Sequence, residues 1–269
     1  MRVFVVSDLE GVSGIVKFGQ IVGGRDLYDE SRRLYTEEIN AAVRGAKAAG
    51  ATEIVVMDCH GAGDEWTFNS LVPDLLDEAC DYVVQDEWTE YTEFLESGVD
   101  AALFVGMHAR AGTPDGVMNH TISGRDYQNL WFNGTLVGET GINAALCGTW
   151  GCPVVLVTGD TAACREGTEL LGPGLVTVAV KQGLGDFGAR NVAPLRARKL
   201  IEEGATRALA DPKAVEPYNP GSPCEIQVEF KTTLAPDKLR HRHGVERVEA
   251  RMIVSRADTW WEAWKQFFF

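Results

Sequence analysis

The chain has 269 residues, of which 45% are hydrophobic and 24% are charged, the balance of an ordinary globular protein with a sizeable core. Its net charge of -14 argues against nucleic acid or an anionic membrane surface as a partner, because both require a basic surface. The first residues show no leader pattern and no apolar run is long enough to cross a bilayer, so we expect no membrane association and a cytoplasmic location.

Short apolar runs recur along the chain, each too short for a helix and apolar on both faces. They are Val3–Val6, Ile54–Met57, Ala101–Val105, Val154–Val157 and Leu175–Val180. Such runs are typical of parallel strands that are covered on both faces. The segment between the first two runs has its apolar residues at helical spacing and stops at Gly50. The alternation predicts an α/β fold, with a mostly parallel sheet flanked by helices.

The second half of the chain predicts a different arrangement. Asn133-Gly134 favours a β-hairpin, because these residues accept the positive φ angles of a tight turn, and a helix follows it. After residue 185 the elements expected are a helix at Pro194–Leu209, strands near Glu225–Thr232 and Val245–Val254, and a terminal helix through Trp260, Trp261 and Trp264. We therefore predict an α/β domain over residues 1–184 and a smaller C-terminal α/β subdomain over residues 185–269.

The six cysteines form no CxxC pair. They are Cys59, Cys80, Cys147, Cys152, Cys164 and Cys224. Their scatter through expected strands and helices predicts neither a disulfide framework nor a zinc knuckle, as for a protein of a reducing compartment.

Carboxylate and imidazole side chains follow the apolar runs. In chain order they are Asp8 and Glu10, Asp58 and His60, His108, His120, and Asp160. Ligands of open α/β sheets bind beyond the carboxyl ends of the strands, so these side chains are expected at one edge of the sheet.

The spacing of Asp8 and Glu10 indicates a metal site. Side chains two residues apart on an extended segment point the same way, and two close carboxylates repel unless a cation lies between them. Imidazoles from His60 and His108 would favour zinc, copper, iron or nickel. A site for two metals needs one more carboxylate, for which Glu139 is a candidate.

Each of these residues also has an ordinary structural role open to it. Asp8 could cap a turn, His60 could be a hydrogen-bonded core histidine, and Glu139 is favoured at a helix start by the helix dipole. Asp58 and Asp160 are expected to support the site or a turn. Elsewhere, a solvated loop is expected at His241 and His243, and packing or a subunit contact at the tryptophans of the terminal helix. The glycines of DLEGVSG do not match GxGxxG and give little support to a nucleotide site.

Five short motifs occur in order over residues 7–141: SDLEG, DCHG, GMHAR, VMNHT and GETG. Together they resemble the D-aminopeptidase family of binuclear zinc peptidases. AVKQG at residues 179–183 and the closing GVERVEARMIVSRADTWWEAW are similar to the family too, so the resemblance covers essentially the whole chain.

The resemblance implies two zinc ions (Zn2+) per subunit. Asp8 matches the bridging carboxylate, Glu10 and His60 complete one zinc, and His108 and Glu139 complete the other. His120 matches the histidine assigned to catalysis. The family's activity is removal of the N-terminal residue from short peptides, with D-residues preferred, D-Ala above all. Its fold has a smaller second domain, and it implies a homo-oligomer, typically a ring-shaped decamer with active sites facing an inner channel.

Two departures from the family leave the preference for D- or L-residues open. Asn119 stands where the family has a small residue, and the aromatic tail that ends at Phe269 is unusual. Neither departure changes a residue at a ligand position.

Two other functions compete with the peptidase. One is a magnesium-dependent phosphohydrolase with Asp8 as its nucleophile, which would leave His60, His108 and His120 without a role. The other is an inactive assembly or binding homologue, which is disfavoured because every ligand position holds a competent ligand.

Overall fold

The computed structural model describes residues 1–268, so Phe269, the last residue of the aromatic tail, lies outside the described residues. The larger sheet has seven strands, in the spatial order β3 (Asp81–Val83), β2 (Glu53–Asp58), β1 (Arg2–Ser7), β4 (Ala101–Met107), β7 (Val154–Asp160), β8 (Val176–Gly185) and β9 (Gly188–Asn191). All neighbours are parallel except β8 and β9. The five predicted apolar runs correspond to strands β1, β2, β4, β7 and β8, which confirms the predicted fold class.

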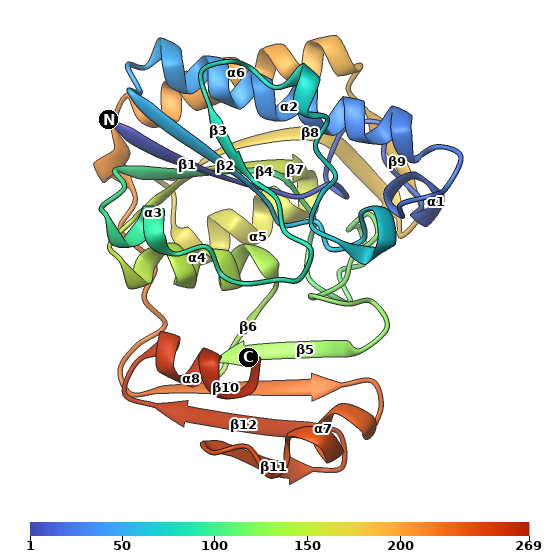
Figure 1. Ribbon diagram of the computed structural model, residues 1–269, viewed down its shortest axis with the longest axis vertical. Coiled ribbons are helices and arrows are strands. Elements are labelled where there is room, and N and C mark those ends of the chain that lie inside the picture. The colour runs from blue at the N-terminus through green and yellow to red at the C-terminus, as the bar shows by residue number, and fades with distance from the viewer. Residues whose placement is uncertain (269) are drawn as a thin grey trace.

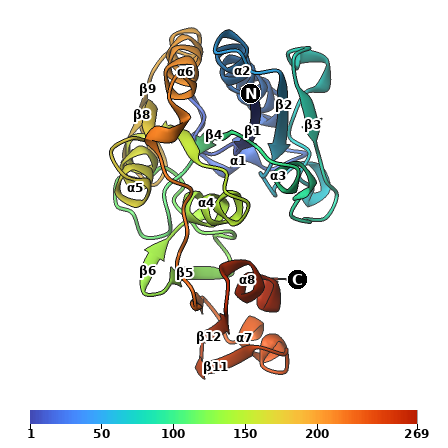
Figure 2. The same cartoon turned by 90° about the vertical axis from the view of Figure 1, so that its left-hand side faces the viewer.

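Helices cover both faces of this sheet (Figure 1). The longer ones are α2 (Tyr28–Ala48), α4 (Glu139–Thr149), α5 (Thr161–Leu171) and α6 (Pro194–Leu209). Helices α2 and α6 pack against each other on one face, and α4 and α5 lie on the other, as Figure 2 shows from the side. The helix predicted before Gly50 is α2, and Gly50 itself takes a φ of 89°, which favours glycine.

Shorter elements connect these layers. They are α1 (Phe18–Ile21), α3 (Glu93–Glu96) and the 3-10 turns Asp64–Trp66, Pro73–Leu75 and Pro212–Ala214. Among the described residues, no helix combines the length and the apolar character needed to cross a membrane.

The smaller sheet is antiparallel, in the order β11 (Val245–Glu249), β12 (Met252–Ala257), β10 (Cys224–Phe230), β5 (Tyr127–Phe132) and β6 (Thr135–Val137). The predicted hairpin joins β5 to β6, with φ angles of 45° at Asn133 and 80° at Gly134. The segment expected as one strand at Val245–Val254 is instead two strands that turn at residues 250–251. This turn contains no glycine or proline, so it carries no strong sequence signal.

Two helices accompany the smaller sheet, α7 (Leu234–Leu239) and α8 (Trp260–Phe268). Helix α8 packs on β10 and β12 and also touches α4, which lies between the two sheets (Figure 1). Residues of α4 and α8 therefore meet where the two sheets face each other.

The domain boundary between residues 184 and 185 remains a prediction, but sheet membership does not follow it. Strand β9 and helix α6 lie beyond residue 184 and belong with the larger sheet. Strands β5 and β6 lie before it and belong to the smaller sheet, where Leu130 of β5 pairs with Val228 of β10. The cause is that the hairpin leaves the larger sheet after β4 and the chain returns through α4.

Candidate metal centre

The carboxyl ends of three adjacent strands carry most of the candidate ligands. Asp8 and Glu10 follow β1, His60 follows β2, and His108 follows β4. The backbones are tightly held there, since Asp8 N donates a 2.8 Å hydrogen bond to Val105 O. Glu139 arrives from elsewhere, as the first residue of α4.

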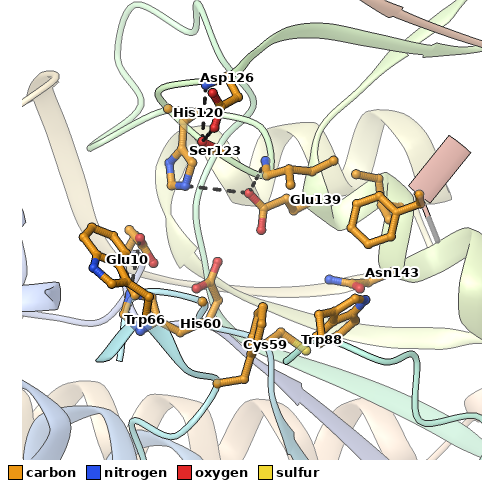
Figure 3. A pocket seen from close by; sticks show the side chains of 18 of the residues that line it. Glu10, Cys59, His60, Trp66, Trp88, His120, Ser123, Asp126, Glu139 and Asn143 are labelled. Atoms are coloured by element: carbon orange, nitrogen blue, oxygen red, sulfur yellow. Dashed lines mark hydrogen bonds and ion pairs between the residues drawn. The ribbon is translucent and has the colours of Figure 1, made fainter. Parts of the chain in front are cut away.

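Interatomic distances show that these residues form one cluster (Figure 3 labels several of them). His108 Nε2 lies 3.3 Å from Asp8 Oδ2 and 3.2 Å from Glu139 Oε1. His60 Nε2 lies 3.6 Å from Glu10 Oε1. All five predicted ligand positions are therefore brought together.

His120 joins the same cluster. Its Nε2 lies 3.8 Å from Glu139 Oε1, and its ring stacks on that of His108 with centroids 4.0 Å apart. His120, His108 and Glu139 have ligand atoms close enough to one another to hold one ion, and so do Asp8, Glu10 and His108.

Each histidine is oriented through Nδ1. The oxygens within hydrogen-bond distance of Nδ1 are Ser70 Oγ at 2.9 Å for His60, Ala109 O at 3.0 Å for His108 and Met118 O at 2.8 Å for His120. A carbonyl oxygen only accepts, so Nδ1 of His108 and of His120 carries a proton, which leaves Nε2 as the ring atom that faces the carboxylates. Metal-binding histidines are typically held in this way.

Four buried atoms in the cluster have no hydrogen-bond partner among the described residues: Asp8 Oδ2, Glu10 Oε2, His60 Nε2 and His108 Nε2. Buried polar atoms in native proteins are almost always paired, so their convergence indicates that these atoms hold a ligand. Carboxylate oxygen with imidazole nitrogen is a donor set that zinc accepts. The residues present therefore fit the zinc ions that the family resemblance implies.

The electrostatics of the cluster lead to the same conclusion. Burial, and then the charge of Glu10, raise the pKa of Asp8 well above its ordinary value. Burial opposes ionisation of His108, yet contacts with Glu139 and Asp8 raise its pKa well above the ordinary value. The cluster can keep all its carboxylates ionised only with added positive charge, which a bound cation would supply.

Two aspartates expected to support the site do so by holding the backbone. Asp58 accepts hydrogen bonds from His60 N at 3.0 Å, Ser70 N at 2.5 Å and Tyr35 Oη at 2.9 Å. Asp160 caps α5 by accepting from Ala163 N at 2.7 Å. It also accepts from Val117 N at 2.7 Å, and so fixes the segment that leads to His120.

Lys181 also supports the site, a role that no sequence motif predicted. Its buried ammonium donates to three backbone carbonyls of the loop after β1: Glu10 at 2.5 Å, Val12 at 3.0 Å and Ile15 at 2.7 Å. A lysine directly after the apolar run Leu175–Val180 was the available signal. Ser70, which contacts Nδ1 of His60, gave no such signal because it lies in an irregular segment.

A cavity of about 810 Å³ opens beside the cluster, and Asp8, Glu10, His60, His120 and Glu139 line it. Figure 3 shows labelled tryptophans and Asn143 around the same space. Most of the remaining lining is apolar, and its aromatic members are Phe18, Trp66, Phe68, Trp88, Trp260, Trp264 and Phe268.

The other residues considered in the sequence lie away from the cluster or at the edge of the cavity. His241 and His243 are exposed beyond α7, as expected of a solvated loop. Trp260 and Trp264 are buried and stack on each other with ring centroids 5.4 Å apart, which is the expected packing, but they also line the cavity. Asn119 donates to Gly116 O and Asp186 Oδ1 rather than entering the cluster.

Comparison with known proteins gives three matches over most or all of the chain. A family model described as D-aminopeptidase matches residues 1–269. A D-aminopeptidase of Bacillus subtilis (strain 168) is 33% identical over 231 residues, which cover 86% of this chain and 81% of that protein. A solved structure described as Zn-dependent D-aminopeptidase DppA from Bacillus subtilis, a self-compartmentalizing protease, superposes with a TM-score of 0.92 at 29% identity, covering 100% of this chain and 96% of that one.

Proposed function

The chain belongs to the D-aminopeptidase family, and on that premise we propose that it is a zinc-dependent aminopeptidase that releases the N-terminal residue from short peptides. The observation that carries the proposal is the convergence of unpartnered buried carboxylate oxygens and imidazole nitrogens beside a large cavity. The two relatives named above are both described as D-aminopeptidases, which supports a preference for peptides that begin with a D-residue.

We assign two zinc ions per subunit to the cluster. Asp8 would bridge them, Glu10 and His60 would complete one, and His108 and Glu139 the other. The distances support this division: His108 Nε2 lies 3.3 Å from Asp8 Oδ2 and 3.2 Å from Glu139 Oε1, whereas His60 Nε2 lies 3.6 Å from Glu10 Oε1. The zinc-dependence of the matched structure supports the choice of metal.

Bound zinc would supply a water of lowered pKa and a polarised peptide carbonyl. His120 would accept a proton during the reaction. Its Nδ1 is fixed by Met118 O, so Nε2, which lies 3.8 Å from Glu139 Oε1 beside the cavity, is the ring atom left to accept a proton. Burial, and then the neighbouring His108, lower the pKa of His120, which leaves Nε2 unprotonated and able to accept a proton near neutral pH.

The remaining chain orients the cluster and the substrate. Asp58, Ser70 and Lys181 hold the backbone segments that carry the cluster. Asn143 lines the cavity, and its carboxamide makes no hydrogen bond within the part of the chain that the structure describes. It is the side chain we assign to hydrogen bonding with the substrate's peptide group.

Hydrolysis of paired substrates tests the proposal. Zinc-loaded protein is incubated with D-Ala-D-Ala and with L-Ala-L-Ala. A second sample, loaded with magnesium instead of zinc, is incubated with p-nitrophenyl phosphate. Cleavage of a dipeptide that is lost on chelation and restored by zinc supports the peptidase. Magnesium-dependent phosphatase activity without dipeptide cleavage would support the phosphohydrolase, whose nucleophilic Asp8 leaves the three clustered histidines unexplained.

Assembly and location are proposed on separate grounds. The matched structure is described as a self-compartmentalizing protease, which supports a homo-oligomer here, and a decamer is the form we propose. Light scattering tests it, because ten copies of the 29.3 kDa chain have a mass of about 293 kDa. All six cysteines are free thiols, which supports a reducing, cytoplasmic location.

A further inference from the structure

We propose that the residue this protein releases carries a bulky apolar side chain, preferably an aromatic one. The site that would hold it, here called the inner pocket, is the part of the cavity lined by Phe68, Trp88, Leu146, Trp264 and Phe268. The inference rests on the proposed aminopeptidase function and adds the substrate class to it.

One face of α4 links the metal cluster to the inner pocket. Glu139, Ile142, Asn143 and Leu146 all line the cavity, and their spacing of three, four and seven residues places them on the same side of the helix. At 1.5 Å per residue, Leu146 lies about 10 Å along the axis from Glu139. That separation exceeds the roughly 3.5 Å that one residue spans along the backbone, so a substrate residue held at the cluster needs a long side chain to reach Leu146.

Aromatic rings form another part of the lining. Phe68 and Trp88 lie with ring centroids 4.9 Å apart, and Trp264 stacks on Phe268 at 4.6 Å. A 2.7 Å hydrogen bond from Trp264 Nε1 to Glu90 Oε1 ties α8 to the segment that carries Trp88. The two pairs of rings therefore belong to one connected wall, although they come from distant parts of the chain.

The exposure of the lining distinguishes a closed end from an open one. Leu146 and Trp264 are each 2% exposed, whereas Trp66 is 69% and Phe18 is 51% exposed. An aminopeptidase must place the N-terminal residue at the closed end, because the rest of the peptide has to leave through the opening. The apolar side chain that fits the inner pocket is thus that of the N-terminal residue.

Size selection follows from the apolar lining. An alanine side chain is too small to cover the half-buried rings of Phe68, Trp88 and Phe268, which then stay in contact with water. A phenylalanine side chain would bury both its own surface and theirs, which favours it by the hydrophobic effect and by ring–ring contacts. Discrimination of this kind amounts to roughly tenfold or more in kcat/KM.

Three dipeptides test the proposal on the zinc-loaded full chain: Phe-Ala, Ala-Phe and Ala-Ala, each as the D,D and the L,L form. We expect kcat/KM for Phe-Ala to exceed that for Ala-Ala about tenfold in the preferred stereochemical series. Equal or faster cleavage of Ala-Ala, or faster cleavage of Ala-Phe than of Phe-Ala, would overturn the inference and leave the peptidase intact. Cleavage of none of the dipeptides would overturn the proposed function and this inference with it.

Substitutions in the inner pocket test whether it is the source of the preference for an aromatic N-terminal residue. Trp88→Ala and Phe68→Ala, both at half-buried positions, should each lower the Phe-Ala to Ala-Ala ratio of kcat/KM by about two- to fivefold, because the other lining residues remain. Trp261→Ala is the matched control, because Trp261 lies on α8 but packs against Trp150 and does not line the cavity. An unchanged ratio in both test variants, or an equal fall in the control, contradicts the inner pocket as the source of specificity.

Discussion

The ammonium of Lys181 donates a 2.5 Å hydrogen bond to the backbone carbonyl of Glu10, from a strand on the far side of β4 and β7. The same ammonium holds the carbonyls of Val12 and Ile15, so one buried cation fixes the loop that carries a proposed zinc ligand. Burial lowers the pKa of Lys181 to about 8, which still leaves it charged at neutral pH.

Replacing Lys181 should therefore weaken metal binding. Lys181→Met keeps the length and apolar stem of the side chain but removes all three hydrogen bonds. We expect zinc affinity to fall about 10- to 100-fold, as for other groups that hold a ligand in place. Competition with a chromophoric chelator measures it. The control is Lys199→Met, at a side chain that is 78% exposed, and equal affinities for the two variants would contradict the role of Lys181.

Glu38 predicts a pH dependence of stability. Burial raises its pKa from 4.5 to about 7, so the folded protein binds more protons than the unfolded chain between these two values. The free energy of unfolding should therefore fall as pH rises across this window, by about 3 kcal/mol from this residue. Glu38→Gln should flatten the curve, because glutamine does not titrate. Denaturant unfolding of the metal-free protein at several pH values checks this, and parallel curves for the two proteins would contradict it.

His60 and His120 should separate metal binding from catalysis. His60→Ala removes a proposed ligand, so both zinc content and activity should fall. His120→Ala removes a proton acceptor, so kcat should drop by about 10²- to 10⁴-fold while both zinc ions stay bound. Metal analysis and steady-state kinetics on the same samples distinguish these results. Loss of a zinc ion from His120→Ala would show that His120 is a ligand, as its 3.8 Å approach to Glu139 allows.

Much of this arrangement could be read from the sequence, because the relevant signals are local. Short apolar runs identified the strands, and Asn133-Gly134 identified the hairpin. The rule that ligands gather at the carboxyl ends of parallel strands then placed Asp8, His60 and His108 together. That rule needs only the order of the elements, not their detailed packing.

The remaining features depend on contacts between distant segments. The hydrogen bond between Trp264 and Glu90 joins α8 to an irregular segment, and no local pattern indicates it. The pairing of β5 with β10 likewise draws an early hairpin into the later sheet, so composition alone placed the boundary near residue 185. Ser70 supports His60 only because its loop folds back over β2.

Zinc titration of the chelated protein, with dipeptide hydrolysis as the readout, tests the central claim most directly. Asp8, Glu10, His60, His108 and Glu139 are proposed to hold two ions, so activity should rise with added zinc and level off at two equivalents per chain. A plateau at one equivalent would contradict the two-ion assignment, and no hydrolysis at any zinc level would contradict the aminopeptidase itself.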